Sequence, residues 1–223
     1  MYIDRKEALR YMGHRGQKID ESLQSLLDAC IDEVMNISKK GFIYEIFDIE
    51  RREEGLYLKG STLILRGEAI HAHLLKAERC AVMAVTLGLE VDRRIAFYSK
   101  TDLTKGLVFD ACAAVAVESL CDMVQSEIEG KAMTMGLDIT SRFSPGYGDF
   151  SIDLQKEIAK VLRTYEKIGL SVNESSIMIP RKSVTAVIGM CKGKCSVKSH
   201  KCGSCEDKYC LYRKVGADDE EQA

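Results

Sequence analysis

The most regular pattern of apolar positions lies between residues 20 and 37, where apolar side chains recur three or four residues apart. This spacing places them on one face of an α-helix. Asp20 is a suitable N-cap before the first apolar residue, and Gly41 follows two lysines where a helix would stop. We therefore expect a long amphipathic helix that packs on a sheet.

Two segments carry the composition of longer β-strands. Residues 42–49 are aromatic and β-branched, and residues 80–87 form a continuous apolar run that Gly88 ends. Further strands are expected over 56–58, 62–65, 176–179 and 183–188, and further helices over 67–77, 91–98 and 151–165. Together the elements predict a single α+β domain with an antiparallel or mixed sheet.

The longest predicted helix runs from about residue 102 to 129. Its centre, residues 111–117, is small and apolar nearly all round, which indicates a helix that is buried between layers and closely approached by its neighbours. Glu118 and Asp122 follow at a spacing of four, so both carboxylates lie on one face. Four cysteines in apolar patterns are predicted to be core residues: Cys30, Cys80, Cys112 and Cys121.

Composition narrows the class of protein. The chain has 223 residues, is 46% hydrophobic and 30% charged, and carries a formal net charge of −2. These values fit a globular protein and give no reason to expect nucleic acid or an anionic membrane as a partner. The charged N-terminus lacks the apolar core of a signal peptide, and no apolar run reaches the ~18 residues that a membrane span needs. We expect a cytoplasmic protein.

The segment from Ser141 to Phe150 is the first candidate for chemistry. It holds one of the two prolines of the chain, and Tyr147 stands between two glycines. Pro145 stiffens the loop, and Gly146 and Gly148 allow backbone angles closed to other residues. Arg142 is suited to a bidentate grip on a carboxylate or phosphate. The same pattern is also typical of a plain turn between a strand and a helix that starts near Ser151.

Glu118 offers a second charge of the opposite sign. If it lies across a pocket from Arg142, the two side chains suit an amino-acid ligand, with Arg142 on the carboxylate and Glu118 on the ammonium or a ribose hydroxyl. The alternative is that the helix simply reaches solvent at Glu118. Neither a Gly-x-Gly-x-x-Gly loop nor a Walker A loop is present, so a nucleotide-like ligand would be held in another way.

The C-terminal region is rich in cysteine and lysine. Five cysteines in the pattern C-x3-C-x6-C-x2-C-x4-C are typical of metal or redox chemistry in a reduced compartment. The candidate ligands of a zinc ion or an iron–sulfur cluster are Cys191, Cys195, Cys202, Cys205 and Cys210. The spacing matches no common zinc or ferredoxin repeat, and free cysteines on a basic tail are the alternative. We divide the chain into a domain over 1–190, a Cys-rich appendage over 191–215 and an acidic tail over 216–223.

Two segments resemble a known family. Arg142 to Gly148 is similar to the R-x-x-P-G-Y signature of the reactivation domain of cobalamin-dependent methionine synthase, and Glu174 to Val184 is similar to its E-S-x-x-M-x-P-x-x-S-V run. Both occur in the same order and at a similar separation, and the likeness extends over most of residues 20–190. The resemblance implies a helmet- or C-shaped α+β domain around a twisted antiparallel sheet.

The resemblance also implies a site for S-adenosylmethionine. Arg142 would hold the methionine carboxylate, the backbone at Ser144 would contact the adenosine, and Tyr147 would lie near the sulfonium. Pro145 and Gly146 would shape the loop, and Glu118 matches the position of a binding carboxylate on the family's long helix. The family's first acidic ligand, near its N-terminus, has no match in this chain.

The implied function is reductive methylation, which returns inactive cob(II)alamin to the active cofactor. This chain shows no folate, homocysteine or cobalamin module, so it would act on a separate methionine synthase or other corrinoid protein, with a flavodoxin- or ferredoxin-type electron donor. No general base is required, and we name no catalytic residue. The alternatives are a non-catalytic module that docks on and regulates a corrinoid protein, and a metal-binding adaptor that works through the cysteine tail.

Overall fold

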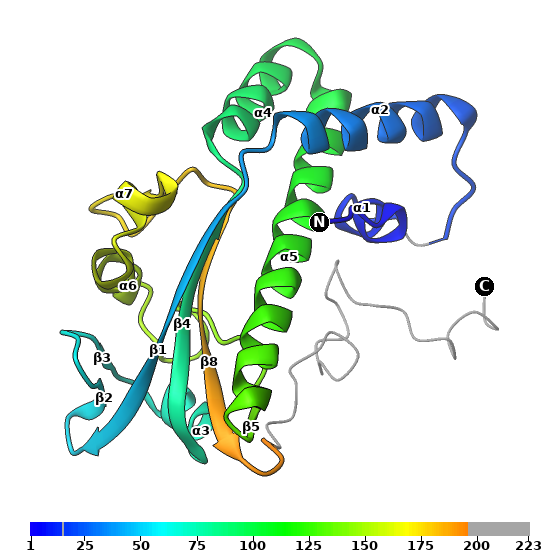
Figure 1. Ribbon diagram of the computed structural model, residues 1–223. Helices are drawn as coiled ribbons and strands as arrows, with labels where there is room; N and C mark the ends of the chain where they lie inside the picture. Colours follow the sequence, from blue (N-terminus) through cyan, green and yellow to red (C-terminus); the bar gives the residue numbers. More distant parts are fainter. Residues whose placement is uncertain (15, 196–223) are drawn as a thin grey trace.

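The structure is a computed structural model that describes residues 1–14 and 16–195 (Figure 1). Its main element is a six-stranded sheet in which every neighbouring pair is antiparallel. In spatial order the strands are β3 (Ile64–Leu65), β2 (Gly55–Leu58), β1 (Gly41–Arg52), β4 (Ala77–Thr86), β8 (Ser183–Lys192) and β5 (Leu137–Ile139). A separate pair joins β6 (Ser171–Val172) to β7 (Met178–Ile179).

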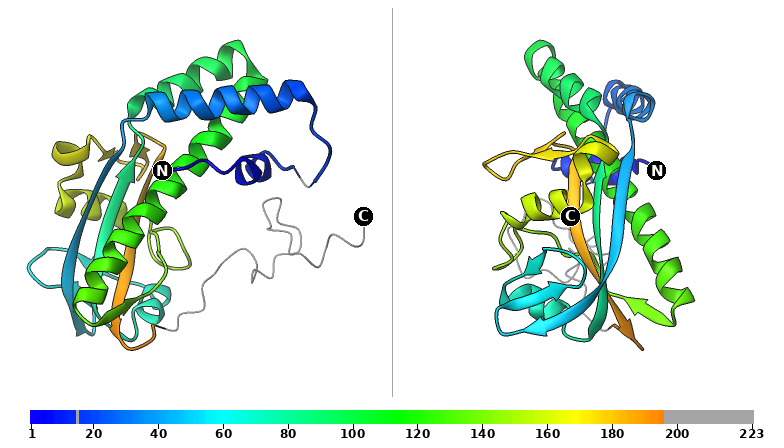
Figure 2. Two further views of the ribbon diagram at one scale, coloured as in Figure 1. Left: turned by 45° about the vertical axis from the view of Figure 1, so that its right-hand side comes forward. Right: turned by 60° about the vertical axis from the view of Figure 1, so that its left-hand side comes forward.

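Helices cover both faces of this sheet (Figures 1 and 2). The long helix α5 (Leu103–Thr134) lies along one face, where α1 (Arg5–Tyr11), α2 (Glu21–Ile37) and α4 (Leu89–Thr101) pack against it. On the other side lie α3 (Glu68–His73), α6 (Leu154–Leu162) and α7 (Thr164–Ile168). The fold is therefore α+β with an antiparallel sheet, as the sequence predicted.

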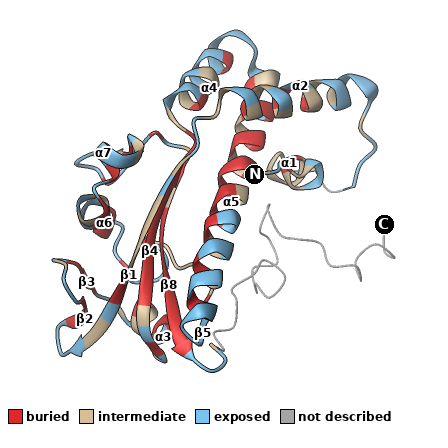
Figure 3. Ribbon diagram, in the orientation of Figure 1, coloured by how far each residue is buried: buried red, intermediate tan, exposed pale blue. Residues whose placement is uncertain are grey.

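The central strand β4 separates two apolar cores, because successive side chains of a strand point to opposite faces. Met83 belongs to the core under α5, whereas Val82 and Ala84 belong to the core under α3 and α6. All three side chains are fully buried, and Figure 3 shows the burial along the strand.

Helix α5 confirms the prediction made from its small residues. Cys112, Ala113 and Ala116 are completely buried in the core that α5 shares with the sheet and α2. Their short side chains let the neighbouring elements approach closely. The helix then continues to Thr134, five residues beyond the expected end near residue 129.

Other predicted elements are confirmed with changed bounds. Asp20 caps α2 by accepting a hydrogen bond from the Leu23 N–H. The helix expected over 151–165 is two helices, because Arg163 adopts a left-handed conformation (φ 54°) that ends α6 and begins α7. The helix expected over 67–77 ends at His73, because the chain turns there to enter β4 at Ala77.

The four cysteines predicted to be core residues are buried and free. Burial raises the pKa of Cys30 to about 11 and the pKa of both Cys112 and Cys121 to about 12. These thiols therefore stay protonated at neutral pH and are poor nucleophiles or metal ligands.

The last strand of the sheet extends beyond the domain boundary expected from the sequence. Strand β8 continues to Lys192, so the boundary expected after residue 190 falls inside the sheet, where Cys191 pairs with Ala77. Most of the expected appendage and the whole acidic tail lie outside the described residues. No helix of the described chain has the length and apolar character that crossing a membrane requires.

Candidate functional site

The Arg142 loop, residues 141–150, leaves the edge strand β5 and leads to α6. Phe143 anchors it, since its backbone N–H and C=O each pair with Val187 of β8 at 2.9 Å. Inside the loop the Gly146 N–H donates to the Phe150 carbonyl at 2.7 Å, and the Tyr147 N–H donates to the Ser144 carbonyl at 3.3 Å. The segment therefore forms a turn, and the hydrogen bonds within its backbone give it a defined shape.

The glycines of the loop have the conformations that the sequence predicted. Gly146 has φ +97° and Gly148 has φ +56°, a region that other residues rarely adopt. A Cβ atom on Gly148 would stand 2.9 Å from the Cβ of Ala69 on α3, so a side chain at this position would clash as well.

Successive residues of the loop reach opposite sides of the sheet. The Arg142 side chain reaches α5, whereas Phe143 packs against the core under α3 and α6. This alternation is that of an extended segment. The Arg142 loop therefore connects the two sides at the β8 edge.

The Arg142 guanidinium meets three side chains of α5. Nη1 donates to Asp122 Oδ1 at 2.8 Å and to Gln125 Oε1 at 2.9 Å, and Nη2 donates to Glu118 Oε2 at 3.2 Å. The structure therefore brings Arg142 and Glu118 together, as a direct ion pair. Sequence reasoning missed Gln125, although the spacing of residues 118, 122 and 125 places all three on one helix face.

Arg142 keeps donors for a further partner. A guanidinium has five N–H groups, and the three bonds to α5 leave Nε–H and one Nη2–H without a partner among the described residues. Partial burial lowers the pKa of Arg142, but the hydrogen bond to Asp122 and the charges of Asp122 and Glu118 outweigh burial and raise it. The side chain is 21% exposed and stays charged.

The other residues of the predicted site lie along the loop with different exposure. Pro145 is buried, Ser144 is half-buried and Gly146 is exposed. Tyr147 is 60% exposed, and its ring makes an edge contact with Phe143, with ring centres 5.9 Å apart.

The N-terminal segment lies beside Glu118, which sequence reasoning did not foresee. The Tyr2 N–H donates to Ser119 Oγ at 2.8 Å. Burial raises the pKa of the Tyr11 hydroxyl, and the nearby negative charge of Glu118 raises it further. No local pattern in the sequence signals this contact, because more than a hundred residues separate the two segments.

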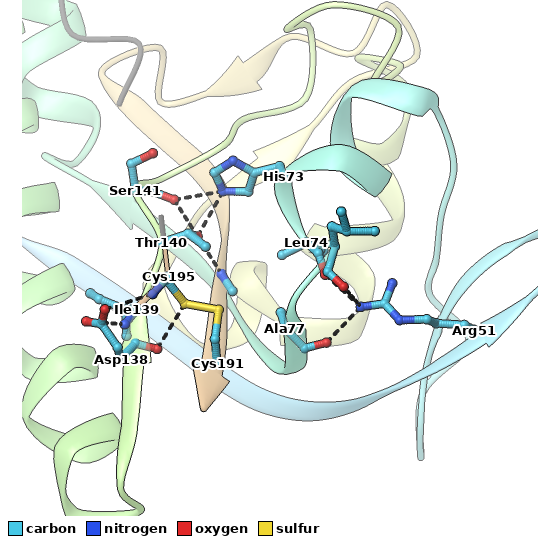
Figure 4. The surroundings of a disulfide bond; sticks show 12 residues. Arg51, His73, Leu74, Ala77, Asp138, Ile139, Thr140, Ser141, Cys191 and Cys195 are labelled. Carbon is cyan, nitrogen blue, oxygen red and sulfur yellow. Dashed lines mark hydrogen bonds between the residues drawn. A yellow bond between two sulfur atoms is a disulfide. The ribbon is translucent and has the colours of Figure 1, made fainter. Parts of the chain in front are cut away.

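Two of the five cysteines predicted to bind metal lie in the described chain. Cys191 and Cys195 are joined by a disulfide at the end of β8, and in this form neither sulfur is a thiolate ligand (Figure 4). The Cys195 N–H donates to Asp138 Oδ2 at 3.0 Å, which ties the turn to β5. Residues 1–14 and 16–195 hold no cluster of three His, Cys, Asp or Glu side chains fit for a metal ion. The remaining three, Cys202, Cys205 and Cys210, lie outside the described residues.

A shallow hollow of about 350 Å³ occurs on α4, away from the Arg142 loop. Its lining comes from one helix only: Glu90, Arg93, Arg94 and Phe97. Glu90 and Arg93 lie three residues apart on this helix and form an ion pair with each other. We regard it as a gap between exposed side chains and keep the Arg142 loop as the candidate site.

Comparison with known proteins identifies the architecture. No known family profile matches the chain, and no curated protein matches its sequence. Among solved structures, the crystal structure of the MetH reactivation domain bound to AdoHcy matches with a TM-score of 0.64 and 17% sequence identity. The match covers 84% of this chain and 74% of that chain. The chain therefore has the fold of the MetH reactivation domain, as the two sequence motifs predicted.

Proposed function

We propose that this protein binds S-adenosylmethionine at the Arg142 loop and supports the reductive methylation of cob(II)alamin on a separate corrinoid methyltransferase. The observation that carries the proposal is the charged, partly exposed Arg142 beside Glu118, on an R-x-x-P-G-Y loop. The fold gives independent support, because the matching MetH reactivation domain was crystallised with AdoHcy.

The polar groups of the site suit the amino-acid end of such a ligand. The unused Nε–H and Nη2–H of Arg142 would donate to its carboxylate. Glu118, whose side chain is 48% exposed, would accept a hydrogen bond from its ammonium or from a ribose hydroxyl. Asp122 and Gln125 would hold the guanidinium in place while the ligand binds.

The loop itself suits the remainder of the ligand. The exposed Gly146 has no side chain, which lets a ligand approach the main chain, and the buried Pro145 keeps the loop stiff. The backbone at Ser144 would contact the adenosine. The exposed Tyr147 ring would face the sulfonium, whose positive charge favours an aromatic face.

The chain would position the reacting groups and leave the bond-making to the cofactors. S-adenosylmethionine supplies a methyl group from its sulfonium and leaves as S-adenosylhomocysteine, and the corrinoid receives one electron from a flavodoxin- or ferredoxin-type donor. The residues of this chain would orient the ligand and keep water away from it. This role requires no general base.

Titration calorimetry with S-adenosylmethionine and S-adenosylhomocysteine tests the site. Replacing Arg142 by Ala removes a charged contact worth about 1.5–3 kcal/mol, so we expect Kd to rise about 10- to 150-fold. Arg93→Ala is the matched control, because Arg93 is exposed and pairs with Glu90 on its own helix. An Arg142→Ala variant that binds as tightly as the wild type would remove the proposed site.

An anaerobic assay tests the role in methylation. The protein is mixed with S-adenosylmethionine, a one-electron reductant and a corrinoid protein in the cob(II)alamin state, and the visible spectrum of the corrinoid is followed. We expect methylation of the corrinoid that depends on this protein. Ligand binding without any effect on the corrinoid would instead favour a non-catalytic docking or regulatory module.

A zinc ion or iron–sulfur cluster held by the cysteine tail is a separate proposal. It requires Cys191 and Cys195 in the reduced form, because their sulfurs are bonded to each other in the structure. Analysis of zinc, iron and acid-labile sulfide in anaerobically purified protein tests it. Metal-free protein in which all five tail cysteines can be alkylated would reject it.

A further inference from the structure

Helix α3 contacts both ends of the Arg142 loop. At its N-terminal end, the Asp149 carboxylate accepts hydrogen bonds from the Glu68 and Ala69 N–H groups at 2.6 and 2.9 Å. At its C-terminal end, His73 Nε2 lies 3.0 Å from the Ser141 carbonyl oxygen (Figure 4). A helix of six residues thus spans the whole loop, from just before Arg142 to just after Gly148.

The His73 contact is a directed hydrogen bond. A carbonyl oxygen only accepts, so the nitrogen that faces Ser141 must carry the hydrogen. Thr140 Oγ lies 2.9 Å from the same nitrogen, accepts from the Gly189 N–H at 2.8 Å and donates to the Ser141 carbonyl at 2.9 Å. His73 is 5% exposed, so this network ties the start of the loop to β8 away from water.

The His73 ring also supports the aromatic side chains of the loop. Its centre lies 4.8 Å from that of Phe143, which in turn contacts Tyr147 at 5.9 Å and Phe150 at 6.0 Å. His73 therefore holds the residue on each side of Arg142, by a hydrogen bond to Ser141 and by ring packing on Phe143. Between these two points the backbone of Arg142 has little freedom to shift.

The backbones of α3 and the loop are in direct contact at the other end. A Cβ atom on Gly67 would stand 2.9 Å from the Asp149 carbonyl oxygen, and one on Gly148 would stand 2.9 Å from the Ala69 Cβ. Glycine at both positions is what permits this approach.

From these contacts we propose that α3 is a brace that fixes the Arg142 loop in its binding conformation, with His73 and Asp149 as the two positioning residues. In this proposal neither residue contacts the ligand. They act by holding Arg142 and Tyr147 in position, so that little ordering of the loop remains when the ligand binds. The effect on ligand affinity rests on the proposed function, whereas the effect on the loop does not.

Hydrogen exchange and calorimetry on three variants test the brace. His73→Leu removes the donor, and we expect the amides of Phe143, Gly146 and Phe150 to exchange about tenfold faster and Kd for S-adenosylhomocysteine to rise by a similar factor. His73→Gln keeps an N–H donor near the position of Nε2, so it should bring both the exchange rates of the loop amides and Kd most of the way back to the wild-type values. Ala72→Gln is the matched control, an exposed position on the same helix, and should change neither the exchange nor Kd.

The outcomes separate the brace from the proposed ligand. The brace would be overturned if His73→Leu folds and the amides of its Arg142 loop exchange hydrogen as slowly as those of the wild type. Wild-type protein that binds neither S-adenosylmethionine nor S-adenosylhomocysteine would overturn the proposed function, while the exchange data would still decide on the brace. Should His73→Leu fail to fold, Asp149→Ala at the other end of α3 gives the same test, and unchanged loop exchange in it would overturn the proposal.

Discussion

The two sides of the sheet are covered by helices of very different length. On the α5 side, a 32-residue helix buries apolar side chains against α1, α2 and α4 and against the strands. On the α3 side, three short helices bury apolar side chains in a core of their own, and the six-residue α3 is in addition held at both ends by polar contacts. Arg51, for example, donates to the carbonyls of Leu74 and Ala77 just after α3 ends (Figure 4).

The difference follows from the lengths of the helices. A long helix such as α5 buries many apolar side chains against its neighbours and does not depend on contacts at its ends. A helix of six residues is unstable alone and depends on groups elsewhere in the chain that satisfy its ends. The Arg142 loop lies where the two sides meet, so Arg142 is held by α5 and its neighbours are held by α3.

The largest expected effect compares two fully buried phenylalanines, Phe109 on the α5 side and Phe150 on the α3 side. Replacing either by Ala leaves a cavity and should lower the free energy of unfolding by about 3–5 kcal/mol, measured by urea denaturation. Phe150→Ala should in addition speed hydrogen exchange in the Arg142 loop, because Phe150 packs on Phe143. Equal loop exchange in the two variants would contradict the difference between the two sides.

A second comparison uses two glycines. Gly148 has a positive φ and stands against Ala69, so Gly148→Ala should destabilise the protein by about 1–2 kcal/mol. Gly130 lies on an exposed part of α5 with open space where a Cβ would point, so Gly130→Ala should stabilise the protein by about 0.5–1 kcal/mol. Thermal unfolding of the two variants measures both, and a stabilising Gly148→Ala would refute the close contact with α3.

A pH dependence is expected from the Asp149 carboxylate. The hydrogen bonds from the Ala69 and Glu68 N–H groups lower its pKa below the ordinary value of 3.8. The bonds therefore stabilise the protein above that value, and the contribution is lost as the pH falls through the lower pKa of the folded state. The difference in unfolding free energy between wild type and Asp149→Asn should be constant above about pH 5 and shrink below about pH 4. A difference that grows on acidification would contradict the assignment.

The smallest effect is expected at exposed apolar side chains of α5. Leu103 and Leu107 are 76% and 58% exposed. Changing either to Ser should alter the free energy of unfolding by no more than about 0.5 kcal/mol, because little apolar contact is lost. A loss above about 1 kcal/mol in urea denaturation would mean that these residues pack in solution against something absent from the structure.

Local patterns predicted the long elements and the shape of the loop. The helical spacing over residues 20–37 and the small residues of 111–117 indicated α2 and the centre of α5, and the apolar run at 80–87 indicated most of β4. The division between α6 and α7 was missed. Arg163 adopts the left-handed conformation there, and an arginine, unlike a glycine, does not signal such a conformation in the sequence. Among the side chains near Arg142, Gln125 was missed because nothing in the sequence says which polar residue of a helix face will meet a loop.

The sequence by itself determined that a stiff loop with an arginine follows a long buried helix, because periodicity and turn chemistry act between near neighbours in the chain. Only the tertiary structure decided what holds that loop. Arg142 meets α5 residues 17 to 24 positions away, Ser141 meets His73 across 68 positions, and Asp149 meets α3 across 80. Contacts at such separations depend on how the strands pair and which face each residue takes, and they form only when the whole sheet has folded.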